Sequence, residues 1–139
     1  MTNLPVEDVL NLIKLDIERL LSFEPVLLGV ATPPRKNGVY MLLEGDLIRY
    51  VGEAKGSGGL RDRLLSKHIS GDDRHAVQRA FSTQFPDRRV RREHIKQTVS
   101  ARWIEIEDHG RVTAVEKTLI WIYKPEWNKQ EIRFRPVVT

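Results

Sequence analysis

The stretch that decides the fold is Gly38-Val39-Tyr40, followed after nine residues by Tyr50-Val51-Gly52. The segments 40–43 and 47–51 are rich in residues that favour β-strands, and Glu44-Gly45-Asp46 between them has the composition of a turn. We therefore predict a β-hairpin that brings Tyr40 and Tyr50 together, provided that the register is right. A plain hairpin needs neither tyrosine, so we expect this one to form half of an active site. The other half is expected near the C-terminus.

The length and composition restrict the class of protein. A chain of 139 residues fits one domain, at roughly 100–200 residues per domain. The absence of cysteine from the sequence excludes a thiol nucleophile, disulfides and cysteine-ligated zinc or iron–sulfur sites. The sequence has no apolar run near the roughly 20 residues that span a bilayer, and its start lacks the basic-then-apolar pattern of a signal peptide. We expect a single-domain cytoplasmic protein over residues 1–139 that has no membrane partner.

The charges are distributed unevenly along the chain. Residues 1–34 contain two basic and five acidic side chains, whereas residues 61–97 contain ten basic and five acidic ones. Four arginines lie within five positions: Arg88, Arg89, Arg91 and Arg92. This asymmetry suits a polyanionic partner, because each neutralised phosphate releases counterions. A solvated helix face explains an isolated charge cluster equally well.

Apolar periodicity predicts the other elements. An amphipathic helix is expected at about residues 4–21, as packing material with no chemistry of its own. Further helices are expected over 60–69, 74–85 and 112–123, a short basic helix or turn over 88–97, and a third strand within 100–107. Gly71-Asp72-Asp73 is a candidate cap, 24–37 a linker, and 132–135 an edge strand or extended arm. The sum is an α+β fold, a small three-stranded antiparallel sheet flanked by helices with an extra N-terminal helix.

Glu116 is the acidic residue most suggestive of chemistry. On its predicted helix it neighbours Val112, Leu119 and Ile120 at three- and four-residue steps. A carboxylate beside an apolar stripe requires a cation, a metal or hydrogen-bond donors, since an unpaired buried charge is expensive. The spacing Thr113-x-x-Glu116 fits a capping box equally well, in which Glu116 only bonds an amide at the helix start.

The remaining candidates are ambiguous when taken singly. Arg63 lies beside leucines on a helix that begins just after the hairpin, where its guanidinium either forks a phosphate or covers apolar surface while pairing with an acid. Asn128 follows the last helix, at a position where asparagine is ordinarily a turn residue. Tyrosines on strands are most often packed aromatics. The combination is more specific than any single residue.

Together these residues resemble the GIY-YIG nuclease family. Gly38-Val39-Tyr40 matches its first motif and Tyr50-Val51-Gly52 its second. Leu60-Arg61-Asp62-Arg63-Leu64 is similar to the family's helix with its catalytic arginine. The segment 116–128, from Glu116 to Asn128, is similar to the closing segment of nucleotide-excision-repair incision subunits. The resemblance covers about residues 37–128.

Three features depart from the family pattern. The loop between Gly52 and Arg63 is longer than in the repair enzymes, which leaves open whether Arg61 or Arg63 holds the catalytic place. Many members have a histidine four residues after that arginine, whereas His68 is five residues after Arg63 and Lys67 holds the fourth place. Some members have a lysine directly after the second motif. Glu53 stands there in this sequence, with Lys55 as a candidate to supply the cation.

The resemblance implies a metal-dependent DNA endonuclease. Its implied catalytic residues are Tyr40, Tyr50, Arg63, Glu116 and Asn128. Glu116 would bind one Mg²⁺ or Mn²⁺ per site, and Arg63 would bind the scissile phosphate. Tyr50 or Tyr40 would be the general base, with Tyr50 preferred and Tyr40 hydrogen-bonded nearby, and Asn128 would orient the site. The expected nucleic-acid-binding residues are Lys55, Arg61, Lys67, His68, Arg88, Arg89, Arg91 and Arg92.

Two alternatives remain at this point. One is a catalytically inactive nucleic-acid-binding module on the same fold. The other is a basic structural or partner-binding domain in which Thr113 and Glu116 form only a cap. DNA is the expected partner, and targeting would come from a partner protein or from a homodimer.

Overall fold

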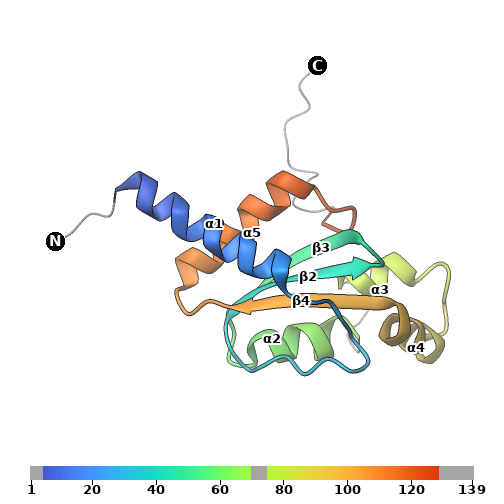
Figure 1. Ribbon diagram of the computed structural model, residues 1–139. Helices are drawn as coiled ribbons and strands as arrows, with labels where there is room; N and C mark the ends of the chain where they lie inside the picture. The colour runs from blue at the N-terminus through green and yellow to red at the C-terminus, as the bar shows by residue number, and fades with distance from the viewer. Residues whose placement is uncertain (1–4, 70–74, 129–139) are drawn as a thin grey trace, which may run out of the picture.

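A computed structural model describes residues 5–69 and 75–128 of the chain. It contains an α+β arrangement in which α1 and α5 lie above the sheet and α2 and α4 lie below it (Figure 1). The helices are α1 Val6–Ser22, α2 Gly59–Arg61, a π-helical turn η1 Asp62–Lys67, α3 Ala76–Phe81, α4 Arg88–Thr98 and α5 His109–Tyr123. The strands are β1 Val26–Leu27, β2 Gly38–Glu44, β3 Leu47–Ala54 and β4 Val99–Glu105.

The sheet has four antiparallel strands in the order β1-β4-β2-β3, so the prediction of three strands is wrong. The additional strand is β1, in which Val26 pairs with Ala101 of β4. It lies within the segment that was predicted to be a linker. A strand of two residues beside Pro25 is too short to produce an alternating pattern, so the sequence contains no signal for it.

β2 lies between β4 and β3 and is buried on both faces. Its side chains alternate between two apolar cores. Tyr40 and Leu42 belong to the core that is covered by α2, η1, α3 and α4. Val39 and Met41 belong to the core that is covered by α1 and α5. We call these the tyrosine face and the α5 face of the sheet.

The β2–β3 hairpin forms as predicted, with Gly45 in a left-handed conformation (φ 58°) at its turn. An irregularity follows in the ladder: Leu43 pairs with Ile48, whereas Leu42 pairs with Tyr50, so Arg49 is an extra residue on β3. This β-bulge reverses the alternation. Ile48 packs on the α5 face and Tyr50 packs on the tyrosine face, although they are only two residues apart.

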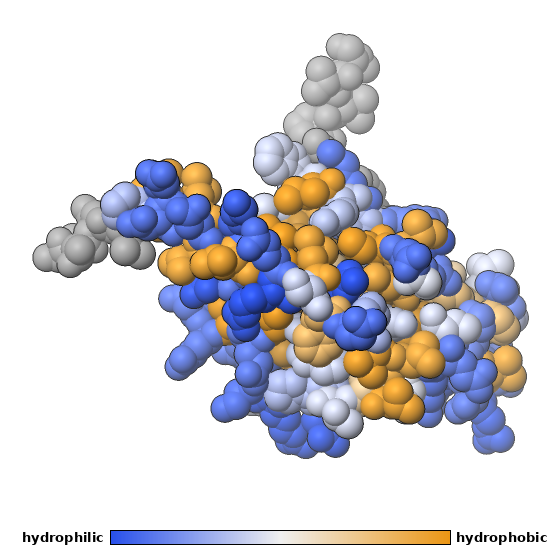
Figure 2. Space-filling model, in the orientation of Figure 1, coloured by the Kyte–Doolittle hydropathy of each residue, from blue (hydrophilic) through white to orange (hydrophobic). Residues whose placement is uncertain are grey.

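α1 confirms the helix predicted at about 4–21, but only part of it is packing material. Ile13, Ile17 and Leu20 pack into the core of the α5 face, whereas the first turns expose Val6 (76 % exposed) and Leu10 (59 %). Figure 2 shows orange apolar side chains beside blue polar ones over this protruding end. Within the described part of the chain, no helix is long and apolar enough to cross a bilayer.

The later helices occur where they were predicted, with shifted ends. α3 is shorter than the predicted 74–85 helix, and α5 begins three residues before the predicted 112–123 helix. Aspartates cap two of them: Asp87 accepts a hydrogen bond from the Val90 amide at the start of α4, and Asp108 accepts one from the Arg111 amide at the start of α5. The predicted cap at 71–73 and the predicted strand at 132–135 lie outside the described residues.

Candidate active site

The hairpin brings its two motifs together across the β2–β3 ladder. Tyr40 pairs directly with Gly52, and the ring centroids of Tyr40 and Tyr50 are 6.1 Å apart. A Cβ atom on Gly52 would lie 2.4 Å from the Tyr40 hydroxyl and 2.8 Å from Cε2 of Tyr50. The glycine of the second motif is therefore required because the tyrosine of the first motif covers its backbone.

The two tyrosines differ in their surroundings. Tyr40 is buried (1 % exposed) and its hydroxyl lies 2.7 Å from Nε2 of His68. Burial above all, reinforced by the charges of Tyr50 and Glu116 and opposed by Arg63, holds the pKa of Tyr40 well above 10. Tyr50 is half-buried at the same face. Tyr40 is thus poorly suited to give up its proton, whereas Tyr50 keeps access to the surface.

His68 is not a surface residue, so the interpretation of this residue as a nucleic-acid contact is wrong. Only 4 % of it is exposed, and both tyrosine rings surround the imidazole, with centroids 5.5 Å (Tyr40) and 5.2 Å (Tyr50) away. Burial, together with the nearby cations Arg63, His75 and Arg79, lowers the pKa of His68 to about 3. The imidazole is therefore neutral at neutral pH and bonds Tyr40 as a neutral partner.

The π-helical turn η1 explains how His68 reaches this position. The His68 amide donates to the Arg63 carbonyl at 3.2 Å, an i→i+5 bond that adds one residue to an ordinary helical turn. The extra residue places His68, rather than Lys67, one turn beyond Arg63. The five-residue separation of Arg63 and His68 that the sequence shows is thus accommodated by a π turn.

Arg63 is better placed than Arg61 for the catalytic role. Arg63 is exposed and lines a cavity of about 230 Å³ together with Glu53, Lys55 and Asp62. Its charge acts on both Tyr40 and His68, as their pKa values indicate. Arg61 is also exposed, but it does not line this cavity.

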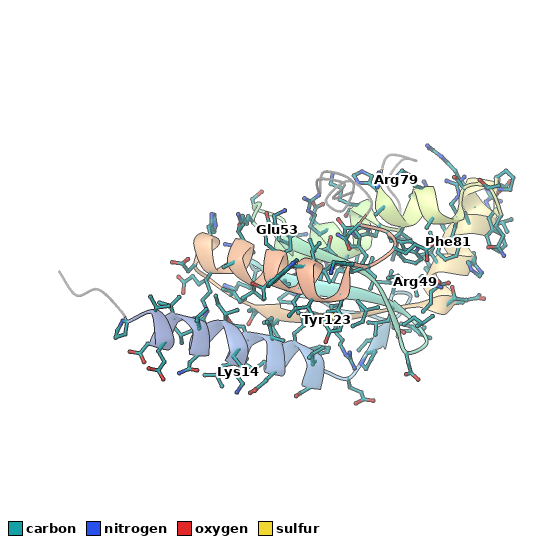
Figure 3. All side chains as sticks on the ribbon, turned by 90° about the horizontal axis from the view of Figure 1, so that it is seen from above. Lys14, Arg49, Glu53, Arg79, Phe81 and Tyr123 are labelled. Atoms are coloured by element: carbon teal, nitrogen blue, oxygen red, sulfur yellow. The ribbon has the colours of Figure 1, made fainter. Side chains whose placement is uncertain are left out.

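Glu116 lies inside α5 and not at its start, so the capping-box interpretation is wrong. The helix is capped by Asp108, and the Thr113 hydroxyl instead donates to Glu53 Oε2 at 3.1 Å while it accepts from Lys55. Figure 3 shows Glu53 beside α5. Glu116 is buried (5 % exposed), and its Oε1 atom lies 3.4 Å from Nζ of Lys117. One helix turn after Thr113, it lies within electrostatic reach of Tyr40.

The donor set at Glu116 fits a hard divalent cation that keeps most of its water. Among the described residues there is no group of three or more His, Asp or Glu side chains that could enclose a metal. Mg²⁺ characteristically binds through one or two carboxylates, with waters and substrate phosphates completing its octahedron. Glu116 offers a single buried carboxylate, which is consistent with that mode of binding.

Asn128 is a positioning residue. It is fully buried, its Oδ1 accepts from the Val51 amide at 2.9 Å, and its Nδ2 donates to the Val51 carbonyl at 2.8 Å. The Trp127 amide donates to the Arg49 carbonyl at 2.9 Å. The closing segment therefore bonds the outer edge of β3 and fixes the strand on both sides of Tyr50.

The predicted nucleic-acid-binding residues differ in whether their side chains reach the surface. Arg88, Arg89 and Arg61 are exposed, and Lys55, Lys67 and Arg92 are half-buried. Arg91 is only 2 % exposed and donates to the Phe85 carbonyl (2.8 Å), the Pro86 carbonyl (3.2 Å) and Gln78 Oε1 (3.1 Å). Its assignment to the nucleic-acid surface is wrong, because its guanidinium is used inside the protein. Gln78 was not predicted to be buried. Its only sequence signal is its position three residues before the buried Phe81, on the same side of α3.

Comparison with known proteins finds solved structures of similar fold but low sequence identity. No family model and no curated protein matches the sequence. One solved structure with a similar fold is a point mutant of the N-terminal GIY-YIG endonuclease domain of UvrC from Thermotoga maritima, bound to its catalytic divalent cation. It is 21 % identical, with a TM-score of 0.46, over 73 % of this chain and 89 % of that one. The magnesium-bound structure of the same domain is 18 % identical, with a TM-score of 0.46, over 83 % of this chain and 97 % of that one.

The chain is similar to GIY-YIG endonuclease domains. This is the family that the sequence motifs resemble. At this level of similarity, neither the activity nor the site residues of those domains can be assigned to this chain. Roles are therefore assigned from the contacts within this chain.

Proposed function

We propose that this chain is a divalent-metal-dependent DNA endonuclease that hydrolyses phosphodiester bonds. The observation that carries the proposal is the meeting of four groups from separate elements: Tyr40 of β2, Tyr50 of β3, Arg63 of η1 and Glu116 of α5. The pKa of Tyr40 responds to all three of the others, so they share one electrostatic environment. A phenol, a guanidinium and a buried carboxylate together suit phosphodiester hydrolysis.

Glu116 would hold one Mg²⁺ or Mn²⁺ ion. Such an ion polarises the phosphate and stabilises charge on the leaving oxygen. Arg63 would bind the scissile phosphate, since its planar guanidinium matches two phosphate oxygens. The exposed position of Arg63 at the cavity makes it accessible to a backbone phosphate.

Tyr50 would take the proton from the attacking water. The free pKa of a tyrosine is about 10, so Tyr50 needs nearby positive charge to act close to neutrality. The bound metal or a nearby cation would supply such charge. Tyr40, which stays protonated beside a neutral His68, would fix the position of Tyr50 and leave proton transfer to it. Asn128 would act through β3, by holding Val51 next to Tyr50.

The DNA backbone would extend from the cavity toward α4. Lys55 lines the cavity, and the exposed Arg88 and Arg89 begin α4. Contacts of this kind bind phosphate and carry no base specificity. They predict an affinity that falls steeply with salt concentration.

A second function, that of an inactive nucleic-acid-binding module, is favoured by one observation. Glu53 stands where some family members have a lysine, and it is paired with Lys55 at 3.4 Å and bonded to Thr113. Part of the positive charge near the cavity is therefore neutralised. This function predicts salt-dependent DNA binding without cleavage in either metal.

The deciding test is nicking of supercoiled plasmid by the purified protein in Mg²⁺ or Mn²⁺, with EDTA as the metal-free control. We expect Glu116→Gln to lower the rate by at least about a hundredfold, because it removes the charge that holds the ion while leaving the shape of the side chain. The matched control is Glu107→Gln, which makes the same chemical change at an exposed position and should cleave as the wild type does.

Circular dichroism melts would confirm that both variants are folded. Wild-type activity in folded Glu116→Gln would refute the site. Metal-independent cleavage, or binding without cleavage by the wild type, would refute the proposed function.

A further inference from the structure

A continuous chain of buried polar contacts links α4 to Tyr40. An NH1 hydrogen of Arg91 is donated to Gln78 Oε1 at 3.1 Å. Nε2 of Gln78 donates to the carbonyls of His68 (2.9 Å) and Ile69 (2.7 Å). His68 Nε2 in turn lies 2.7 Å from the Tyr40 hydroxyl. These contacts, joined through the backbone of His68, thus connect the basic helix to the first motif tyrosine.

Burial makes this chain geometrically demanding. Arg91, Gln78, His68 and Tyr40 are each between 1 % and 4 % exposed. A buried polar group without its partner is costly, so each group is held where its neighbour can reach it. The amide of Gln78 uses both of its hydrogens and its oxygen, and the donor from Arg91 fixes which end of the amide is the oxygen.

Gln78 acts on the backbone that follows the π turn. The carbonyls of His68 and Ile69 come directly after η1, where a helix end leaves carbonyl groups without intrahelical donors. Gln78 supplies those donors from α3. It therefore fixes the backbone segment that carries the His68 ring, and hence the position of the imidazole relative to the Tyr40 hydroxyl.

α3 and α4 form one unit around this contact. Arg91 also holds the Phe85 and Pro86 carbonyls of the connection between the two helices. Figure 3 labels Arg79 and Phe81 on α3, with α4 beside them. Phe81 packs against His94 of α4 (4.9 Å between centroids) and against Trp127 of the closing segment (5.5 Å).

We propose that Gln78 and Arg91 are positioning residues that set the His68–Tyr40 contact, so that the α3–α4 segment determines the geometry of the catalytic tyrosines. The inference rests on the proposed nuclease function for its effect on rate, but the contact itself can be tested without activity. Neither residue touches the cavity at Arg63. Their loss should therefore lower kcat and leave KM nearly unchanged.

The main variant is Gln78→Leu, which removes the amide at similar volume. Its matched control is Gln84→Leu, the same change at an exposed position six residues further along. Because Gln78→Leu leaves Arg91 and two carbonyls buried without Gln78, a paired variant is needed in case folding fails. Gln78→Met with Arg91→Met also removes the buried guanidinium, which is the costliest group to leave without its partner.

Two measurements decide the inference. Plasmid nicking in Mg²⁺ should show kcat lowered at least tenfold with KM within twofold for the folded variants, and no change for Gln84→Leu. Arg91→Lys keeps the charge and part of the donor set, so it should lose less of the rate than the paired variant. The second measurement is the ¹⁵N shift of the His68 ring in histidine-labelled protein, which contains four histidines and can be assigned with His68→Gln.

The ring shift of His68 should move in Gln78→Leu and in the paired variant, and stay unchanged in Gln84→Leu. Folded variants with wild-type kcat and an unmoved His68 ring would overturn the inference. A wild type that never cleaves DNA would refute the proposed function, and the His68 shift would still test the positioning contact. An unmoved ring would then reject it.

Discussion

The two faces of the sheet hold their functional groups by different means. Glu116 is buried on α5, a 15-residue helix that is capped by Asp108 and packs on the α5 face. On the tyrosine face, Tyr40 is held by a chain of buried hydrogen bonds that extends to Arg91. The two faces are linked electrostatically, because the charge of Glu116 acts on Tyr40.

This difference predicts how each face responds to substitution. A carboxylate that is placed by helix geometry can be replaced by its amide without disturbing the fold, so the effect falls on chemistry. A tyrosine that is placed by a hydrogen-bond network is disturbed by a substitution at any of its partners. Stability and activity should then change together. The following predictions test this contrast.

The largest loss of activity is expected when the two tyrosines are substituted in turn. Tyr50→Phe should reduce kcat by about 10²–10⁴-fold with little loss of stability, because it removes the proposed general base at a half-buried position. Tyr40→Phe should reduce kcat less and lower the free energy of unfolding by about 1 kcal/mol, because it removes the buried bond to His68. Steady-state nicking rates and urea melts measure the two quantities. The reverse ranking of the kcat losses would exchange the roles of Tyr40 and Tyr50.

The sequence was sufficient for elements whose signal is local. The hairpin, the helix containing Glu116 and the closing segment could be predicted because β-formers, helical periodicity and turn residues mark them. β1 could not, since two residues carry no period. The bulge at Arg49 and the π turn at η1 each insert one residue, and one extra residue has no compositional signature.

The buried role of Arg91 illustrates a different limit. Within a cluster of four arginines the charges look alike, so the sequence suggested a single surface. Arg91 and Ile95 are four residues apart and both are buried, which identifies the inward side of α4. Helical spacing relative to an apolar residue is therefore a better guide to the direction of a charge than the density of the cluster.

A smaller effect is expected where the tyrosine face is most tightly packed. Gly52→Ala places a Cβ atom 2.4 Å from the Tyr40 ring, and the ring cannot withdraw while its hydroxyl is bonded to His68. We expect a loss of about 1–3 kcal/mol in the free energy of unfolding, as for other overpacked cores, with a parallel loss of activity.

The matched control for overpacking is Gly56→Ala. Gly56 has open space at its Cβ position and should retain the stability of the wild type. Thermal and urea melts of the two variants give the comparison. Equal stability of Gly52→Ala and the wild type would show that Tyr40 is held less firmly than its contacts indicate.

The last effect concerns the pH dependence of stability. Because the pKa of His68 is about 3 in the folded protein and near 6.5 when unfolded, the unfolded state binds one more proton between these values. Stability should therefore be complete above pH 6.5 and fall as the pH is lowered toward 3, by up to about 1.4 kcal/mol per pH unit. Carboxylates add their own dependence below about pH 5. The window that isolates His68 is pH 5–6.5.

His68→Gln should flatten the stability profile in that window, since glutamine has no proton to gain. His109→Gln is the control, because His109 is exposed and bonds Asn37 at the surface. Urea melts at half-unit pH intervals would measure the difference between each variant and the wild type. An unchanged slope in His68→Gln would mean that the imidazole accepts a proton while folded, and the neutral Tyr40–His68 pair would then be wrong. A flattened slope would show that the tyrosine face keeps its histidine neutral.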